Sequence, residues 1–133
     1  MIVRTLAEIL DTEAHVKGES FESRRILLAR DRLGYSFHDT LVKKGTVQRL
    51  QYKNHVEANY CIEGEGELEE AKTGRRWQLK PGTMYVPDNH EEHLIHATKS
   101  DLRFICIFSP ALAGSEKHDA DGGYAAPDDI SAD

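Results

Sequence analysis

Two segments of the chain carry side chains that could bind a metal ion beside a small polar molecule. His55 and Glu57 lie two residues apart, just before a glycine-containing hairpin, and Tyr85 and His93 follow in a second segment. Side chains two residues apart on a strand point to the same face of a sheet. If both segments are strands of one barrel, their oxygen and nitrogen donors meet in a common pocket. The pattern therefore indicates a site for a metal and a small polar substrate.

Three of these residues also have a simpler interpretation. Glu57 could be a solvated residue on an exposed strand face, and Tyr85 is of a type that usually packs into a core. His93 ends a run of six polar residues and could be an exposed loop histidine. The residue types and their spacing leave both interpretations open.

The elements that would position these residues are mostly β-strands. Short runs rich in β-forming residues are separated by turn residues at intervals of about 8–12 residues. The expected strands are residues 25–29, 35–40, 46–52, 56–62, 67–71, 76–79, 83–86, 94–97 and 102–108. This rhythm predicts an all-β barrel or sandwich rather than alternating strands and helices. Thr5 and Glu8 have the spacing of a capping box, which predicts a short N-terminal helix.

The chain of 133 residues has room for one domain. We expect a barrel over residues 1–118. Residues 119–133 hold five aspartates and no lysine or arginine, which predicts an acidic, flexible C-terminal tail. In the last strand, Ile105 and Ile107 form a second apolar face opposite the one that would line the barrel. This outer face predicts a homodimer.

Charge and hydropathy exclude several classes of partner. The formal net charge of −6 argues against a nucleic-acid or anionic-membrane partner. We find neither an apolar run of about 18 residues nor a signal-peptide pattern, so we expect a cytoplasmic protein without a membrane span. Cys61 and Cys106 lie in apolar runs and are expected to be reduced core thiols.

Part of the glycine and ligand pattern resembles the cupin superfamily. Gly45, Glu57 and Gly64 match the spacing of the first cupin motif, although Gln51 and Lys53 stand where that motif has two histidines. His93 falls at the expected place of the histidine in the second motif. The resemblance implies a small, jelly-roll-like cupin barrel.

The altered motif resembles ectoine synthases in particular. The similar segments are MIVRTL, FESRRILLA, GYSFHDT, YKNHVEANYCIEGEGE, KPGTMYVPDNHEEH, FICIFSP and EKHDADGGY, which extend to about Tyr124. The resemblance implies an iron-dependent hydro-lyase that closes N-γ-acetyl-L-2,4-diaminobutyrate to ectoine with loss of water. Ectoine is a compatible solute, which implies a role in osmotic stress.

The resemblance also implies the roles of individual residues. Glu57, Tyr85 and His93 would bind the iron. Phe21 stands where the family commonly has tryptophan and would keep an aromatic wall, whereas His38 replaces a common asparagine and changes a polar contact. The positions that match substrate contacts of the family are Arg25, Thr40, Tyr52, His55, Cys106, Phe108, Glu116 and His118.

The chemistry of the reaction suggests how these side chains would divide the work. His55 could remove a proton from the α-ammonium of the substrate, since an unperturbed imidazole has a pKa near 6.5, and Tyr52 could relay that proton. Arg25 would pair with the substrate carboxylate. Glu116 and His118 could close over the amine end.

The metal and the reaction each have alternatives at this stage. A glutamate, a tyrosine and a histidine leave positions open for substrate, and zinc or another divalent ion would also suit them. Only the resemblance points to Fe²⁺. The protein could instead be an oxygen-using metal cupin or a cupin that binds a small ligand without catalysis.

Overall fold

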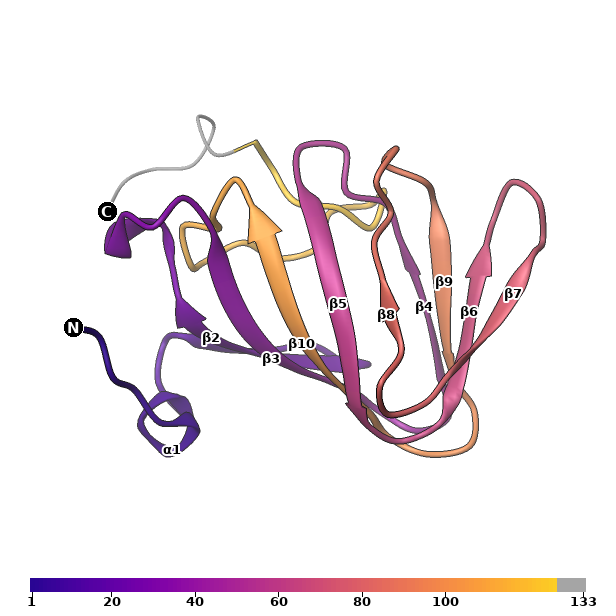
Figure 1. Ribbon diagram of the computed structural model, residues 1–133, viewed down its shortest axis with the longest axis horizontal. Helices are drawn as coiled ribbons and strands as arrows, with labels where there is room; N and C mark the ends of the chain where they lie inside the picture. Colours follow the sequence, from indigo (N-terminus) through magenta and orange to yellow (C-terminus); the bar gives the residue numbers. More distant parts are fainter. Residues whose placement is uncertain (127–133) are drawn as a thin grey trace.

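Two antiparallel β-sheets face each other in the computed structural model, which describes residues 1–126 (Figure 1). The first sheet contains, in spatial order, β1 (His15–Lys17), β2 (Phe21–Leu27), β3 (Ser36–Val42), β10 (Leu102–Ser109), β5 (Val56–Glu63) and β8 (Met84–Tyr85). The second contains β4 (Thr46–Leu50), β9 (His93–Ala97), β6 (Gly66–Glu70) and β7 (Arg76–Leu79). The predicted all-β fold is confirmed.

Helical structure is confined to two short elements in the described part of the chain. The helix α1 (Leu6–Ile9) begins at the predicted capping box, in which Thr5 and Glu8 each bond the backbone N–H of the other. The 3₁₀ helix η1 (Ala29–Asp31) follows β2. No helix within residues 1–126 has the length and apolar character needed to cross a bilayer.

Alternation of side chains along β10 and β5 builds the interior. The even-numbered residues of β10, Leu102 to Phe108, are buried, whereas Ile107 is 38% exposed, as the period of two predicts. On β5 the buried positions are Glu57, Asn59 and Cys61. One end of the interior is therefore polar, although the surrounding core is apolar. Cys61 and Cys106 are both buried and unbridged, as predicted.

Strand register brings the polar residues to one level of the barrel. Glu57 lies opposite Phe108, and Asn59 lies opposite both Cys106 and Tyr85. His93 comes from the facing sheet, where it begins β9. The candidate ligands thus approach the interior from both sheets.

A tight hairpin holds β5 and β6 against the loop before β10. Gly64 has φ +90°, and a Cβ atom there would lie 1.9 Å from the carbonyl oxygen of Asp101. A larger residue would push the two loops apart. The backbone N–H of Glu65 donates to Ser100 Oγ at 2.9 Å, which closes this end of the barrel.

The structure corrects the start of the first sheet. β1 was not expected, and the strand predicted for residues 25–29 is β2, which already begins at Phe21. Glu22, Arg24 and Arg25 obscure the apolar alternation of β2. Arg24 is nevertheless buried, because it donates to Asp39 Oδ1 on β3 at 2.6 Å.

The structured part of the chain extends beyond the predicted boundary at residue 118. Tyr124 is only 4% exposed and belongs to the main core cluster. The segment that carries it crosses the end of the barrel opposite the β5–β6 hairpin (Figure 1). Residues 127–133 of the predicted tail lie outside the described residues.

Candidate metal and substrate site

A small cavity between the sheets collects most of the predicted site residues. Its volume is about 30 Å³, which is room for about two water molecules. Eight of the twelve predicted residues line it: Phe21, Thr40, Tyr52, Glu57, Tyr85, Cys106, Phe108 and His118. The other four, Arg25, His55, His93 and Glu116, are buried but do not line the cavity.

The Glu57 carboxylate is buried with one oxygen unused. Its side chain comes from β5 and is 6% exposed, and Oε1 has no hydrogen-bond partner within residues 1–126. Burial raises the pKa of Glu57 to about 7, against the opposing hydrogen bonds of Asn59 and Cys106. A cation beside this oxygen would restore the charged form.

His93 is oriented as metal-binding histidines usually are. Its Nδ1 donates to the backbone carbonyl of Glu91 at 2.9 Å, which leaves the lone pair on Nε2. His93 is 3% exposed, and Nε2 has no partner in the described part of the chain. Burial lowers the pKa of His93, so the neutral, ligating form is favoured.

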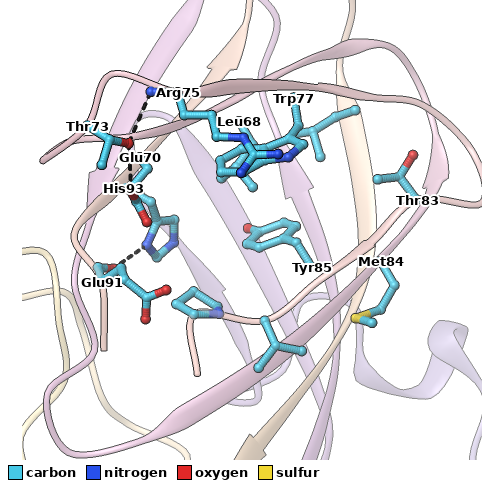
Figure 2. Close-up of a pocket in the computed structure, with 13 residues that line it drawn as sticks. Leu68, Glu70, Thr73, Arg75, Trp77, Thr83, Met84, Tyr85, Glu91 and His93 are labelled. Atoms are coloured by element: carbon cyan, nitrogen blue, oxygen red, sulfur yellow. Dashed lines mark hydrogen bonds between the residues drawn. The ribbon is translucent and has the colours of Figure 1, made fainter. Parts of the chain in front are cut away.

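Tyr85 lies beside His93, with ring centroids 5.9 Å apart in an edge-to-face arrangement. In Figure 2 its hydroxyl end points toward His93. Burial raises the pKa of Tyr85 well above its usual value, and the charge of Glu57 adds to this effect. A phenol with such a pKa would bind as phenolate only next to a cation.

The donor set fits a divalent metal. Within residues 1–126, no three His, Cys, Asp or Glu side chains gather as a metal-binding group. The site instead offers one such carboxylate and one imidazole, each with an unpartnered atom, together with a phenol. Carboxylate, imidazole and phenolate suit transition metals of the iron or zinc type.

Tyr85 and His93 also form part of a wall that faces outward. Figure 2 shows the groove on that side, which has a volume of about 430 Å³. Trp77 lines this groove, with the guanidinium carbon of Arg75 4.7 Å from its ring centroid. The groove is larger than the inner cavity, but none of the predicted substrate residues lines it.

His55 immediately precedes β5, and its ring faces the C-terminal segment. The ring centroid lies 5.9 Å from that of Phe108 and 6.3 Å from that of Tyr124, edge-on to both. Both ring nitrogens of His55 are buried without a partner among the residues described. The ring is therefore free to accept or donate a proton.

Arg25 and Glu116 meet behind the cavity. The Arg25 side chain is fully buried and donates to Ser23 Oγ at 3.1 Å and to the carbonyl of Gly114 at 2.9 Å. Glu116 lies 3.7 Å from Arg25 Nη1. It accepts the backbone N–H groups of Ala113 and Gly114, both at 2.7 Å. The chain after β10 is thus tied to β2 by charge.

Tyr52 and His118 close the cavity from the side of the C-terminal segment. The Tyr52 hydroxyl lies 2.8 Å from His118 Nε2, close enough to share a proton. The Phe21 ring lies 4.8 Å from that of His118, so the predicted aromatic wall is present.

The sequence and fold of this chain match one family throughout. A family model described as "Ectoine synthase" matches residues 1–128. The chain belongs to the ectoine synthase family. An L-ectoine synthase from Oceanobacillus iheyensis is 53% identical over 124 residues, which are 93% of this chain and 96% of that protein.

Solved structures agree with the family and with the cupin fold. The crystal structure of an ectoine synthase from P. lautus is 48% identical, with a TM-score of 0.85, and the match covers 92% of this chain and 87% of that chain. A Cupin_2 domain of a transcriptional regulator from Enterobacter cloacae is only 13% identical, with a TM-score of 0.57, and the match covers 68% of this chain and 97% of that one. That likeness confirms the fold alone.

Sequence reasoning missed Asn59 and Tyr124, which both line the cavity of this ectoine synthase family member. Asn59 lines the cavity and accepts from the Cys106 thiol at 3.2 Å. Tyr124 lines it too, although it falls in the segment predicted as tail. One signal was available for Tyr124, because it is the only aromatic residue after position 110.

His38 lies outside the cavity wall and is fully buried. Its Nε2 lies 2.8 Å from Ser36 Oγ, and its Nδ1 lies 3.5 Å from Ser23 Oγ. Burial lowers the pKa of His38 to about 3, and the charge of Arg25 adds to this effect. His38 is therefore neutral at physiological pH and supports Ser23, which in turn binds Arg25.

We predict that His38 makes the metal-free protein less stable below pH 6.5. The unfolded chain binds a proton at His38 below about pH 6.5, whereas the folded protein does so only near pH 3. From pH 7 to pH 5.5 this residue should therefore lower the free energy of unfolding by about 1 kcal/mol. Urea titrations at both pH values should show a smaller decrease for His38→Asn. An equal decrease in both proteins would contradict the prediction.

Proposed function

We propose that the cavity cyclises N-γ-acetyl-L-2,4-diaminobutyrate to ectoine, with loss of water, and that Glu57, Tyr85 and His93 hold a divalent metal there. Membership of the ectoine synthase family supports this hydro-lyase reaction. The observation that supports the metal is the pair of buried, unpartnered ligand atoms, Glu57 Oε1 and His93 Nε2. We propose Fe²⁺ as the ion, and the same residues would also accept zinc.

Metal assistance suits this reaction because its electrophile is an amide. Attack on an amide forfeits conjugation, whose strength is indicated by a rotation barrier of about 18–20 kcal/mol. A bound divalent cation supplies Lewis-acid polarisation of the amide oxygen, which is worth several kcal/mol. Glu57 and His93 would hold the ion between the sheets, and Tyr85 would add a third ligand.

The barrel itself contributes orientation and dryness. Amine and carbonyl belong to one molecule, so the walls need only hold it bent, and Phe21 and Phe108 provide apolar surface for that purpose. The narrow cavity admits little water, which favours loss of water over hydrolysis.

Proton transfer would be performed by the residues on the side of the C-terminal segment. His55 has both ring nitrogens unpartnered and would accept the proton of the α-ammonium. Tyr52 and His118 share a hydrogen bond through which that proton could pass onward. Arg25 would pair with the substrate carboxylate, and Glu116 would hold Arg25 in place.

We predict that purified protein with ferrous iron forms ectoine under argon, as followed by chromatography. Chelation or Glu57→Ala should lower turnover by at least about 100-fold and reduce the metal content measured by mass spectrometry. Glu65→Ala is a matched control, because Glu65 is an exposed acidic residue beyond the same strand. Turnover that requires dioxygen would indicate another metal cupin. Binding without product would indicate a ligand-binding module.

The proposed role of His55 as the general base predicts a loss of turnover without a loss of metal. Replacing His55 with alanine should lower kcat by about 10²–10⁴-fold, since a general base contributes that much, and should leave the metal content unchanged. His96→Ala is the control, because His96 faces outward on β9 and pairs with Glu69. Turnover close to that of the unmodified protein would remove His55 as the base.

We also propose that two copies associate through an apolar patch on the outer face of β5 and β10. Val56, Tyr60 and Ile107 form this patch on adjacent strands and are 37%, 47% and 38% exposed. Sedimentation should give about twice the chain mass of 15.0 kDa, and Ile107→Lys should shift the protein toward the monomer. A monomer at all concentrations would contradict this.

We place the protein in the cytoplasm, acting in osmotic stress.

A further inference from the structure

The segment after β10 can lie against the barrel because two glycines permit a close approach. The backbone N–H of Gln51 donates to the carbonyl of Gly122 at 3.1 Å. A Cβ atom at Gly123 would lie 2.4 Å from the carbonyl oxygen of Gln51, and one at Gly122 would lie 2.4 Å from that of Arg49. Any other residue at either position would move the segment away.

A tight turn between these glycines and Asp119 brings His118 and Tyr124 face to face. Asp119 N donates to the carbonyl of Gly123 at 2.9 Å, and Gly123 N donates to Asp119 Oδ1 at 3.1 Å. The rings of His118 and Tyr124 are stacked, with centroids 4.6 Å apart and an interplanar angle of 10°. The backbone of Tyr124 is held as well, because Asn54 Nδ2 donates to its carbonyl at 2.9 Å.

The Tyr124 ring contacts Arg25, which would pair with the substrate carboxylate, and Tyr52, which would relay the proton of the α-ammonium. The Arg25 guanidinium carbon lies 5.5 Å from its centroid, and Arg25 Nη2 lies 3.4 Å from its hydroxyl. The rings of Tyr52 and Phe108 lie 5.2 and 5.6 Å away. Tyr124 is therefore the part of the core cluster that also contacts proposed site residues.

We propose that Tyr124 is a positioning residue of the substrate site, whose ring aligns the His118 imidazole at the cavity and the Arg25 guanidinium behind it. This inference rests on the proposed function. The stacked ring restricts rotation of His118 and thereby maintains its 2.8 Å contact with the Tyr52 hydroxyl. The aromatic face also receives the Arg25 cation, which orients its planar group.

The environment of His118 agrees with this arrangement. Burial lowers the pKa of His118 to about 4, and the charge of Arg25 adds to this effect. The Tyr124 ring covers one face of the imidazole and contributes to that burial. His118 is thus held neutral, with Nε2 next to Tyr52.

A competing explanation is that Tyr124 only plugs the cavity. A volume of about 30 Å³ is too small for an acetylated diamino acid, so part of the wall must move when substrate binds. If Tyr124 were merely a plug, its removal would make binding easier. If it positions Arg25 and His118, its removal would weaken binding and slow turnover.

The test compares Tyr124→Phe, which keeps the ring, with Tyr124→Leu, which removes it, in the full iron-loaded protein. We expect Tyr124→Phe to stay within about threefold of the unmodified protein in kcat and KM. Tyr124→Leu should raise KM, lower kcat, and reduce kcat/KM by roughly 10–100-fold, the combined scale of one stacking and one cation–π contact. Tyr35→Leu is the control, because Tyr35 is 38% exposed and outside the site.

Gly123→Ala tests the alignment of His118 and Arg25 while keeping the Tyr124 ring. The added methyl group should displace the segment and shift kcat and KM in the direction of Tyr124→Leu. Metal content and far-ultraviolet circular dichroism should be unchanged in all variants. A lower KM for Tyr124→Leu, unchanged kinetics, loss of metal, or failure of the phenylalanine variant to retain activity would each overturn the proposal.

Calorimetric titration with N-γ-acetyl-L-2,4-diaminobutyrate separates this inference from the proposed reaction. If the unmodified protein binds the compound but forms no ectoine, the proposed function fails. The role of Tyr124 is then decided by affinity, which Tyr124→Leu should weaken and Tyr124→Phe should retain. Absence of binding by the unmodified protein would overturn both.

Discussion

The interior is built around buried polar atoms that no group within residues 1–126 satisfies. Leaving a buried donor or acceptor without a partner costs about 1–3 kcal/mol, and more for a charged group. Glu57 Oε1 and His93 Nε2 both carry this cost in the described part of the chain. The surrounding core offsets it, because two complete sheets bury apolar residues around the site. A cation bound at this point would remove the cost and tie the two sheets together.

Two of the proposed metal ligands also separate two spaces. Tyr85 lines both the inner cavity and the outer groove, and His93 lines the groove. The proposed ligands are therefore wall residues, supported on the outside by Arg75, Trp77 and Glu91. The proposed substrate residues lie away from the groove, mostly on β2, β3, β10 and the C-terminal segment. Orientation of the ligands and binding of the substrate are thus assigned to different elements.

Much of the fold was accessible from the sequence because its signals are local. The alternation in residues 102–108 and the capping box at Thr5 depend only on neighbouring residues, and both are confirmed. β1 and the start of β2 were missed because burial of Arg24 depends on Asp39, which is distant in sequence. The spacing of apolar residues along one strand cannot predict a contact such as that of Arg24 with Asp39.

The sequence predicted less of the candidate site than of the fold. Spacing alone brought His55 and Glu57 into consideration, but the roles of Tyr85 and His93 came from resemblance to the family. Tyr124 was missed because its contacts to Arg25 and His118 form only after the chain has returned across the barrel. A composition rich in aspartate gave the opposite expectation for that segment.

The small size of the inner cavity has a kinetic consequence. A cavity with room for about two water molecules is too small for an amino-acid derivative, so its walls must move before the substrate fits. Each catalytic cycle then includes at least one displacement of backbone or side chains before binding and another before product leaves. Such displacements take microseconds to milliseconds and set an upper limit on throughput that is independent of the bond-making step.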